Sequence, residues 1–547
     1  MARLPQWTSR SKVSDINRDP LGLVRVFDRM GEWLLSGVTT ATRRARYYAF
    51  YPWAIWSTTT VHHTHARPGF VNGLRRREAA FVLAQAAVES KSEPIGTNLL
   101  GVDEGRRHWN EREPSQPISL DFRPLPANDL GGYGQVYQGS LFKLGLVSRP
   151  ESANGCDLVT EAAMPLVRAY QDAIGHTAYG QTLATSDPAS LSAENLVGYG
   201  KKCRIRALSV GEKVTIQDLM FGPPTLDAPE AINRRDSFLW CLWVTGQAER
   251  ADGFESETID RLLLGQAAYT NRLLRDGREI QLEVPEALRT CADRYALLRG
   301  HGYAMCALEA VFGLLLDATA PDPLTVEGFV DGLSLPNLKR AWSRRMRVPP
   351  ARDVLAGWLE SSAATPNRGR GALTDPGSEY GLEFAFDDAG PADVLAACVM
   401  TFFAIYERQR AWRGVHPPWI EMSGWAGDDL WFEQIAKLID ECADQRVSFR
   451  DFLVRLIRDI ILRHERRTHS QRGQSHSPWL RQDDRNRIGR VKGYETFMRP
   501  SRLNSAMSIL NDLGLVDMNS DPDAETANAI RLTADGRRLL RARGLGG

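Results

Sequence analysis

The sequence reads Leu513-Gly514-Leu515-Val516 and then, after the polar residues 519–528, Leu532-Thr533-Ala534-Asp535-Gly536, and this stretch decides the fold. Glycine readily adopts the left-handed conformation that ends a helix, so Gly514 predicts a helix end. Threonine is a favoured N-cap, so Thr533 predicts the start of a closing helix. The apolar runs on either side of the polar residues predict a two-stranded hairpin between these two points.

Residues 502–513 come directly before this stretch, and Leu503, Met507 and Leu510 in them recur with a helical period. The order of helix, Leu-Gly-Leu-Val, hairpin and Thr-capped helix resembles the winged-helix superfamily. The resemblance implies a C-terminal module in which the hairpin is the wing. Winged helices bind DNA by placing one helix in the major groove, but the same fold also docks proteins, so both roles stay open.

The same order is found a second time, earlier in the chain. Leu144-Gly145-Leu146-Val147 is followed, after a shorter segment, by Val159-Thr160-Glu161-Ala162-Ala163. Because a repeated pattern indicates a repeated structural unit, residues 135–174 are predicted to form a second winged-helix-like module. Gln135 and Gln138, on its first predicted helix, are candidates either to read bases or to line a surface.

A basic segment leads into the C-terminal module. Residues 463–502 contain eleven lysines and arginines against four carboxylates. Phosphate contacts dominate the affinity of proteins for DNA, so this segment is predicted to contact DNA, although its charges could instead pair with acidic patches elsewhere in the protein. The residues of this segment predicted to bind DNA are Arg485, Arg487, Arg490, Lys492, Arg499 and Arg502.

Residues 42–56 combine arginines with aromatic side chains on a helix that is predicted to start near Thr39 or Thr40. Arginines beside aromatic rings can hold phosphates and stack on bases. The alternative, favoured for the aromatic residues, is that they form core and that an arginine pairs with a buried carboxylate such as Glu78. The residues of this region predicted to bind DNA are Arg43, Arg44, Arg46, Tyr47 and Tyr51.

The region 33–46 also resembles the helix-hairpin-helix motif of DNA glycosylases and related repair proteins. Leu35-Ser36-Gly37-Val38-Thr39 is similar to the start of the family's L-P-G-V-G-x-x-T-A, with Ser36 in place of proline and Thr39 in place of the second glycine. The resemblance implies DNA contact. It does not extend to catalysis, because the catalytic aspartate of the family has no counterpart near residues 57–61.

The overall composition excludes some classes of protein. The chain has 547 residues, with 68 lysines and arginines, 67 aspartates and glutamates and a net charge of +1. This balance excludes a uniformly basic DNA-coating protein but allows local basic faces. The seven cysteines show no C-x-x-C spacing, as expected for reduced residues of a cytoplasmic protein. No apolar run of about 18 residues is present, so no membrane contact or span is predicted.

The periodicities predict a mostly α, multi-domain protein in which helical bundle domains accompany one or two winged-helix (α+β) modules. Residues 101–132, rich in proline, glycine and charge, are predicted to be loop, and residues 258–274 a helix. The predicted domains are 1–100 with the Arg/aromatic helix, 101–230 with the first module, a helical domain at 231–360, a flexible linker at 361–380, a helical region at 381–465, and the basic segment with the C-terminal module at 466–547.

No motif for a cofactor or a metal is present. Residues 131–134 are not followed by the G-K-S/T of a phosphate loop, and neither G-x-S-x-G nor H-E-x-x-H occurs. His62 and His65 lie three residues apart, but without a nearby carboxylate or cysteine an exposed turn is favoured over a metal site. We therefore expect no cofactor and no metal, and assign no catalytic residue.

Three functions agree with these patterns. The first is a prokaryotic DNA-binding protein of genome maintenance or of antiviral defence against foreign DNA, which contacts double-stranded DNA through its winged-helix and basic segments. The second is a DNA base-excising, glycosylase-like enzyme that acts on flipped or modified bases. The third is a kleisin-like assembly subunit, whose protein partner is a chromosome-organising ATPase.

Overall fold

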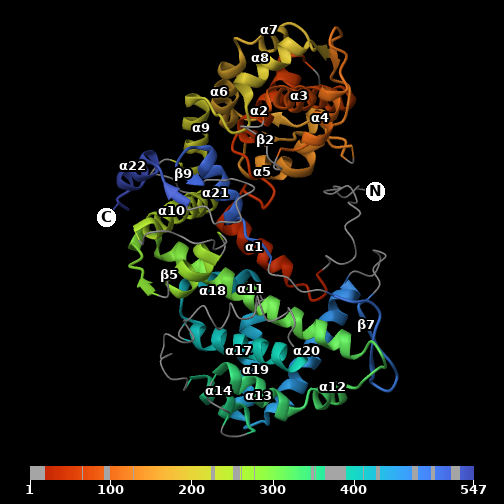
Figure 1. Ribbon diagram of the computed structural model, residues 1–547, viewed down its shortest axis with the longest axis vertical. Coiled ribbons are helices and arrows are strands. Elements are labelled where there is room, and N and C mark those ends of the chain that lie inside the picture. The colour runs from red at the N-terminus through yellow and green to blue at the C-terminus, as the bar shows by residue number, and fades with distance from the viewer. Residues whose placement is uncertain are drawn as a thin grey trace. The chain divides into compact units, whose positions relative to one another are not determined.

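The computed structural model describes residues 19–546, apart from 64–65, 91–98, 127, 223–227, 251–258, 260, 276–277, 347–349, 351–352, 364–389, 411, 427–430, 471–477, 495–498 and 519–529. The described residues are mostly helical, and each sheet among them is a two-stranded antiparallel hairpin or ribbon (Figure 1). The predicted mostly α fold is therefore confirmed. No helix in the described part of the chain is long and apolar enough to cross a membrane.

Contacts within the chain define two compact units. Unit 1 contains Glu32–Ile259 and Ser501–Gly547, and unit 2 contains Asp260–Pro500 with the described residues of Val13–Gly31. The C-terminal module thus folds together with the first half of the chain. The finer division into six segments stays a prediction, and the predicted linker lies outside the described residues from residue 364 onward.

The core of unit 1 surrounds α2 (Tyr47–Trp56), nine of whose ten residues are buried. A helix that is apolar on all sides must be covered on all sides, and α2 packs against α3, α6 and α9. The other helical segments described in unit 1 are η2 (Ser57–Val61), α3 (Arg67–Val88), α4 (Val102–Asn110), η3 (Tyr133–Tyr137), α5 (Gln138–Lys143), η4 (Glu151–Ala153), η5 (Glu161–Ala163), α6 (Met164–Ile174), α7 (Ala178–Leu183), α8 (Ala193–Cys203), α9 (Val210–Phe221), α10 (Pro229–Arg250), α21 (Leu503–Asp512) and α22 (Ala534–Ala542).

Three strand pairs belong to unit 1. One pair joins β1 to β4, and the other two are hairpins that each follow a helix directly. Their antiparallel registers are equivalent, because Val147 lies opposite Val159 and Val516 lies opposite Leu532. The strands are β1 (Ile118–Ser119), β2 (Val147–Ser148), β3 (Leu158–Val159), β4 (Ser190–Leu191), β9 (Val516–Met518) and β10 (Ile530–Leu532).

The C-terminal module has the turn that its sequence predicts. Gly514 ends α21 with a φ of +74°. The N–H of Leu515 donates to the carbonyl of Leu510 at 2.9 Å, which closes the end of the helix. The Thr533 hydroxyl donates to the carbonyl of Gly514 at 2.7 Å and accepts from the N–H of Gly536 at 3.1 Å. Thr533 therefore caps α22 and also fastens it to the end of α21.

The earlier module repeats this turn, although the Thr160 hydroxyl does not cap the helix that follows. Gly145 has a φ of +67°, and the N–H of Leu146 donates to the carbonyl of Leu141 at 2.9 Å. The Thr160 hydroxyl donates to the carbonyl of Gly145 at 2.6 Å. The predicted sequence repeat is thus also a structural repeat of helix, turn, hairpin and helix.

Unit 2 is organised by α11 (Glu286–Ala318), a helix of 33 residues that packs against η6, α17, α18, α19 and α20 (Figure 1). Its other described elements are η6 (Arg261–Thr270), β5 (Arg272–Arg275), β6 (Arg278–Gln281), α12 (Val326–Gly332), α13 (Leu335–Met346), α14 (Leu355–Ala363), α17 (Pro391–Gln409), α18 (Pro417–Ala426), α19 (Trp431–Asp444), α20 (Phe449–Ser470), β7 (Leu480–Gln482) and β8 (Ile488–Arg490). Helix α1 (Val24–Leu34) comes before all of these in the chain.

The start predicted for the Arg/aromatic helix is wrong. The helix begins at Tyr47, not near Thr39 or Thr40. The N–H of Thr39 donates to the Thr42 hydroxyl at 2.7 Å, and the N–H of Ala45 donates to the Asp512 carboxylate at 3.0 Å. These side-chain acceptors replace the carbonyls that a helix would supply, so turns fill the interval.

Two other local predictions need correction. The segment 101–132, predicted as loop, contains α4 (Val102–Asn110). The predicted helix 258–274 ends at Thr270, and Arg272–Arg275 instead pairs with Arg278–Gln281. The sequence between these two strands is Asp-Gly, which is a strong signal for a hairpin. The helical spacing of the apolar residues in 258–274 favoured a helix instead.

The two equivalent glycines provide a test of the repeated turn. We expect Gly145→Ala and Gly514→Ala each to lower the free energy of unfolding by about 1–2 kcal/mol, because a Cβ disfavours a left-handed backbone. The measurement is urea unfolding monitored by circular dichroism. Gly139→Ala is the matched control: it lies in α5, and a Cβ there would meet no atom within 4 Å. An equal loss in all three variants would contradict the conformational explanation.

Candidate nucleic-acid interface

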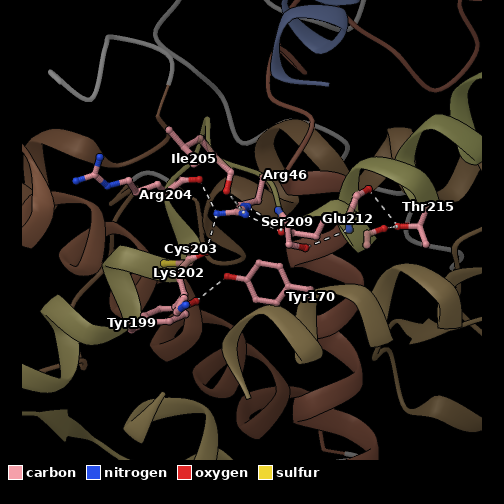
Figure 2. A network of polar contacts seen from close by, with 12 residues as sticks. Arg46, Tyr170, Tyr199, Lys202, Cys203, Arg204, Ile205, Ser209, Glu212 and Thr215 are labelled. Carbon is pink, nitrogen blue, oxygen red and sulfur yellow. Dashed lines mark hydrogen bonds and ion pairs between the residues drawn. The ribbon is translucent and has the colours of Figure 1, made fainter. Parts of the chain in front are cut away.

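Arg46 lies immediately before α2, at the centre of the network in Figure 2. Its Nε and Nη2 donate to the two carboxylate oxygens of Glu212 at 2.9 and 2.6 Å, and both side chains are completely buried. Nη1 and Nη2 also donate to the carbonyls of Lys202, Arg204 and Ala207 at 3.3, 2.5 and 2.8 Å. Every N–H of the guanidinium therefore has an acceptor.

Glu212 is held in place for this contact by the start of α9. The N–H of Glu212 donates to the Ser209 hydroxyl at 3.2 Å, and the N–H of Ser209 donates to the Glu212 carboxylate at 2.8 Å, which is a capping box. Burial opposes the charge on Arg46, but its charged surroundings, with the Glu212 carboxylate as the main contributor, raise the pKa of Arg46 overall. One carboxylate thus caps a helix and also neutralises a buried cation.

The chain around these carbonyls carries an unusual concentration of positive charge. Residues 201–213, which we call the basic loop, contain five cations, and their one carboxylate is the buried Glu212. Lys201, Lys202 and Arg206 are exposed, whereas Arg204 and Lys213 are half-buried. Arg46 therefore fixes the backbone of the basic loop from inside, while three of its five cations are exposed.

The basic loop lies beside the end of α21. A Cβ on Gly514 would lie 3.3 Å from the Nζ of Lys213. Burial lowers the pKa of Arg206, as does the nearby Arg44, while Asp512 opposes both effects. The C-terminal module and the basic loop consequently form one continuous region of unit 1.

Arg44, predicted to bind DNA, is buried and connects that region to the turn before α2. Its Nη1 donates to the Asp512 carboxylate at 2.8 Å, and the main-chain N–H of Arg44 donates to the Tyr137 hydroxyl at 3.3 Å. Burial raises the pKa of Asp512, and Arg44 counteracts that rise. Residues from α21 and η3 therefore both hold the same turn.

The other predicted residues of this region also lie mostly inside unit 1. Tyr47 and Tyr51 are buried and stacked with ring centroids 5.2 Å apart, and Tyr47 contacts Tyr137 at 4.8 Å. Burial raises the pKa of both tyrosines. Arg43 is half-buried, and its Nε donates to the carbonyl of Thr40 at 3.1 Å. The structure thus places the tyrosines in the aromatic core, as the alternative interpretation expects.

The carboxylate suggested as the partner of these arginines, Glu78, has a different role. It is buried below the turn before η3, where it accepts the N–H of Tyr133 at 2.9 Å. Burial raises its pKa to about 7, although hydrogen bonds from Tyr133, Tyr51 and Gly132 oppose the shift. The partner of Arg46 is instead Glu212, which lies 166 residues away in the sequence.

The two glutamines of the first module have different surroundings. Gln135 is exposed, whereas Gln138 donates to the buried Asp157 at 2.6 Å. The hydroxyl of Tyr133 and the Nε of Arg149 also bind Asp157, at 2.7 and 2.6 Å. Gln138 therefore takes part in a hydrogen-bond network that ties η3 and α5 to the hairpin, and Gln135 is the one that faces solvent.

The basic segment at 463–502 is divided between the two units. Its exposed positions include the turn between β7 and β8 in unit 2, where Arg485 lies. Arg487 pairs with Asp483 at 2.8 Å and Arg490 pairs with Asp317 at 3.0 Å. Part of the predicted positive charge is therefore neutralised by neighbouring carboxylates.

The remaining three predicted residues of this segment also interact with other residues of the protein. The Lys492 ammonium lies over the Trp479 ring, 4.0 Å from its centroid. Arg499 lies close enough to Glu309 to lower the pKa of that carboxyl, which burial raises to about 7. Arg502 belongs to unit 1, where its Nη1 donates to the carbonyl of Val38 at 2.8 Å.

Helix α21 is largely enclosed. Seven of its ten residues are buried, and the other three are half-buried. It packs against α10, and Asp512 near its end binds Arg44. In a DNA-binding winged helix, the helix that directly precedes the hairpin enters the major groove. Here that helix presents little surface to any partner.

Among the described residues, no three His, Cys, Asp or Glu side chains are grouped so that they could hold a metal ion. His62 is described, but His65, the other histidine of the pair noted in the sequence, lies outside the described residues.

Comparison with known proteins gives no match: neither a family model, nor a curated protein, nor a solved structure is similar to this chain. The resemblances to winged-helix and helix-hairpin-helix proteins therefore depend on the local residue patterns alone.

The Arg46 network predicts a strong and specific effect on stability. We expect Arg46→Lys to lower the free energy of unfolding by about 3–5 kcal/mol, because an ammonium cannot replace a bidentate guanidinium and leaves buried acceptors unpaired. Urea unfolding of the two proteins measures the difference. Arg43→Lys is the control, with an expected change within about 0.5 kcal/mol, since its hydrogen bond is exposed. Similar losses in the two variants would contradict the assignment.

The raised pKa of Glu78 predicts that the free energy of unfolding depends on pH. Its folded pKa of about 7 exceeds the ordinary value of 4.5, so the raised pKa does not affect stability below pH 4.5 and destabilises the fold progressively as the pH rises to 7. We therefore expect Glu78→Gln to be more stable than the wild type at pH 8, by up to about 3 kcal/mol, and nearly equal to it at pH 4.5. Urea unfolding at the two pH values tests this. A difference that is the same at both values would exclude a charge effect.

Proposed function

We propose that this protein binds double-stranded DNA through its phosphates, with the basic loop of unit 1 as the main contact. The observation that carries the proposal is the charge of this loop: five cations accompany a single carboxylate, and that carboxylate is buried against Arg46. DNA affinity depends chiefly on such cations, because each phosphate contact releases condensed counterions. Genome maintenance and defence against foreign DNA are the roles that we propose for this binding.

The way in which the backbone is held supports the proposal. Arg46 binds the carbonyls of Lys202, Arg204 and Ala207, so little conformational freedom is lost when the loop meets a partner. Lys201 and Lys202 lie in the last turn of α8. Among the described residues, no carboxylate lies within ion-pair distance of Lys201, Lys202 or Arg206, so these charges are available to phosphates.

The C-terminal module adds to this surface. We propose that it is a winged-helix-like module, on the strength of its order of helix, turn, hairpin and capped helix. Its closing helix α22 exposes Arg537, Arg538 and Arg541, and Asp535 pairs with Arg538 at 3.0 Å. Since α21 is enclosed, contact through this module would involve the phosphate backbone and not the edges of the bases. We therefore propose binding with little sequence preference.

Fluorescence anisotropy of a labelled duplex across a salt series tests the proposal. We expect Lys201→Ala/Lys202→Ala/Arg206→Ala to weaken binding and to reduce the slope of log K against log salt by about 2–3, since each lost phosphate contact removes about 0.9. The wild type should bind two duplexes of unrelated sequence with similar affinity.

Two further variants separate this surface from others. Lys339→Ala/Arg340→Ala/Lys437→Ala removes the same charge from unit 2 and should leave binding unchanged. Arg481→Ala/Arg485→Ala tests the turn between β7 and β8, the surface to which the sequence alone points. A loss confined to this last variant would move the interface to unit 2, and a wild type without salt-dependent binding would exclude the DNA function altogether.

A further inference from the structure

Two aliphatic side chains at the start of α9 are exposed, and we call them the valine strip. Val210, the first residue of the helix, is 81% exposed, and Val214, one turn later, is 50% exposed. Residues four apart lie on the same face of a helix, so the two side chains are neighbours. The exposed carboxylate of α9, Asp218, lies about 12 Å further along the helix than Val210. The valine strip is therefore an apolar surface at the end of α9 that belongs to the basic loop.

The valine strip lies next to cations. Lys213 is three residues after Val210, which makes the two side chains neighbours on the helix surface. The carbonyl of Lys202 and the carboxylate of Glu212 bind the same guanidinium, that of Arg46, so the end of α8 lies close to the first turn of α9 (Figure 2). A partner that covers the valine strip must therefore also lie against positive charge, and a negatively charged partner is the one that complements it.

The valine strip is held rigidly and has open space beside it. The capping box of Ser209 and Glu212 fixes the first turn of α9, and Arg46 fixes Glu212. Gly211 has no side chain, and among the described residues a Cβ there would meet only the Cβ of Ala169, at 3.8 Å. Valine has one strongly preferred side-chain conformation in a helix, so it loses little freedom when it enters a binding site. The strip is thus pre-organised for contact.

We infer that the valine strip inserts at a base step from the minor groove of DNA, while the cations of the basic loop hold the flanking phosphates. Apolar side chains that enter the minor groove in this way partly unstack the bases and kink the duplex. The preferred substrate is then DNA that is already kinked, such as a duplex with a bulge. This inference rests on the proposed DNA binding and adds the form of DNA that the same surface selects.

The small size of the valine strip favours DNA over a lipid surface as the partner. Binding of a helix to anionic lipid grows with the apolar area that enters the membrane. Helix α9 offers two aliphatic side chains for this purpose, because its Ile216, Met220 and Phe221 are buried in unit 1. A minor-groove wedge needs no larger apolar area, since phosphate contacts supply much of the affinity for DNA.

Fluorescence anisotropy of the full-length protein with two labelled duplexes tests the inference. The duplexes share one sequence, and one of them contains an unpaired adenine bulge. The wild type should bind the bulged duplex at least about tenfold more tightly, because the unstacking that opposes insertion in the intact duplex has already occurred. Energy transfer between dyes at the two ends of the intact duplex should rise on binding, since a kink brings the ends closer together.

One variant and a matched control place the effect on the valine strip. Val210→Ala/Val214→Ala should abolish both the preference for the bulged duplex and the rise in energy transfer. It should leave the slope of log K against log salt unchanged, because it removes no charge. Alanine favours a helix more than valine does, so the variant should stay folded, which a circular dichroism melt checks. Val415→Ala/Ile420→Ala, at side chains of unit 2 that are 71% and 52% exposed, should behave as the wild type does.

Three results would overturn the inference while the proposed DNA binding stands. The first is that the wild type binds the intact and the bulged duplex equally well. The second is that Val210→Ala/Val214→Ala keeps the preference, and a loss of binding to phosphatidylglycerol vesicles in that variant would then assign the valine strip to a lipid surface. The third is that the unit 2 control loses the preference to the same extent. A wild type that binds neither duplex would instead exclude the proposed function, and this inference with it.

Discussion

The buried pair of Arg46 and Glu212 is the interaction on which unit 1 depends most. Taking two charges out of water is expensive, and the expense is offset only when every remaining donor and acceptor finds a partner. Arg46 meets this condition through three main-chain carbonyls, and Glu212 through the cap of α9. The pair therefore cannot form unless α2, the end of α8 and the start of α9 are all in place.

The need of Arg46 for internal acceptors connects the core of unit 1 to the basic loop at its surface. The aromatic side chains of α2 are enclosed, so Arg46 directly before them has no route to solvent and must use internal acceptors. Those acceptors are carbonyls of the basic loop, whose side chains at Lys201, Lys202 and Arg206 are exposed. An arginine without any exposed area thus decides where the exposed cations lie. A change at Arg46 would affect the proposed DNA contact only through the backbone of the loop.

The sequence allowed the repeated turn to be predicted closely, because its signals are local. Gly514 and Thr533 act on neighbouring residues, and Gly145 and Thr160 repeat the same chemistry. The capping box at Ser209 and Glu212 is equally local and visible as Ser-x-x-Glu. The partner of Arg46 could not be predicted in this way, because only the tertiary fold distinguishes Glu212 from another buried carboxylate such as Glu78.

Long-range structure also explains which predicted contacts are buried. Arginines next to tyrosines suit both a phosphate surface and an ion-paired core, and the choice depends on whether other helices cover them. Here α3, α6 and α9 cover α2.

The charge of an exposed surface also depends on the tertiary fold. The net charge of +1 over 547 residues does not describe the charge of any one surface, because buried carboxylates count in the total as much as exposed ones do. Glu212 and Asp512 are two such carboxylates, and each neutralises a buried arginine. In the described part of the chain, no carboxylate lies within ion-pair distance of the exposed Lys201, Lys202 or Arg206. A nearly neutral chain can in this way present a strongly basic face where its acidic residues have been drawn into the core.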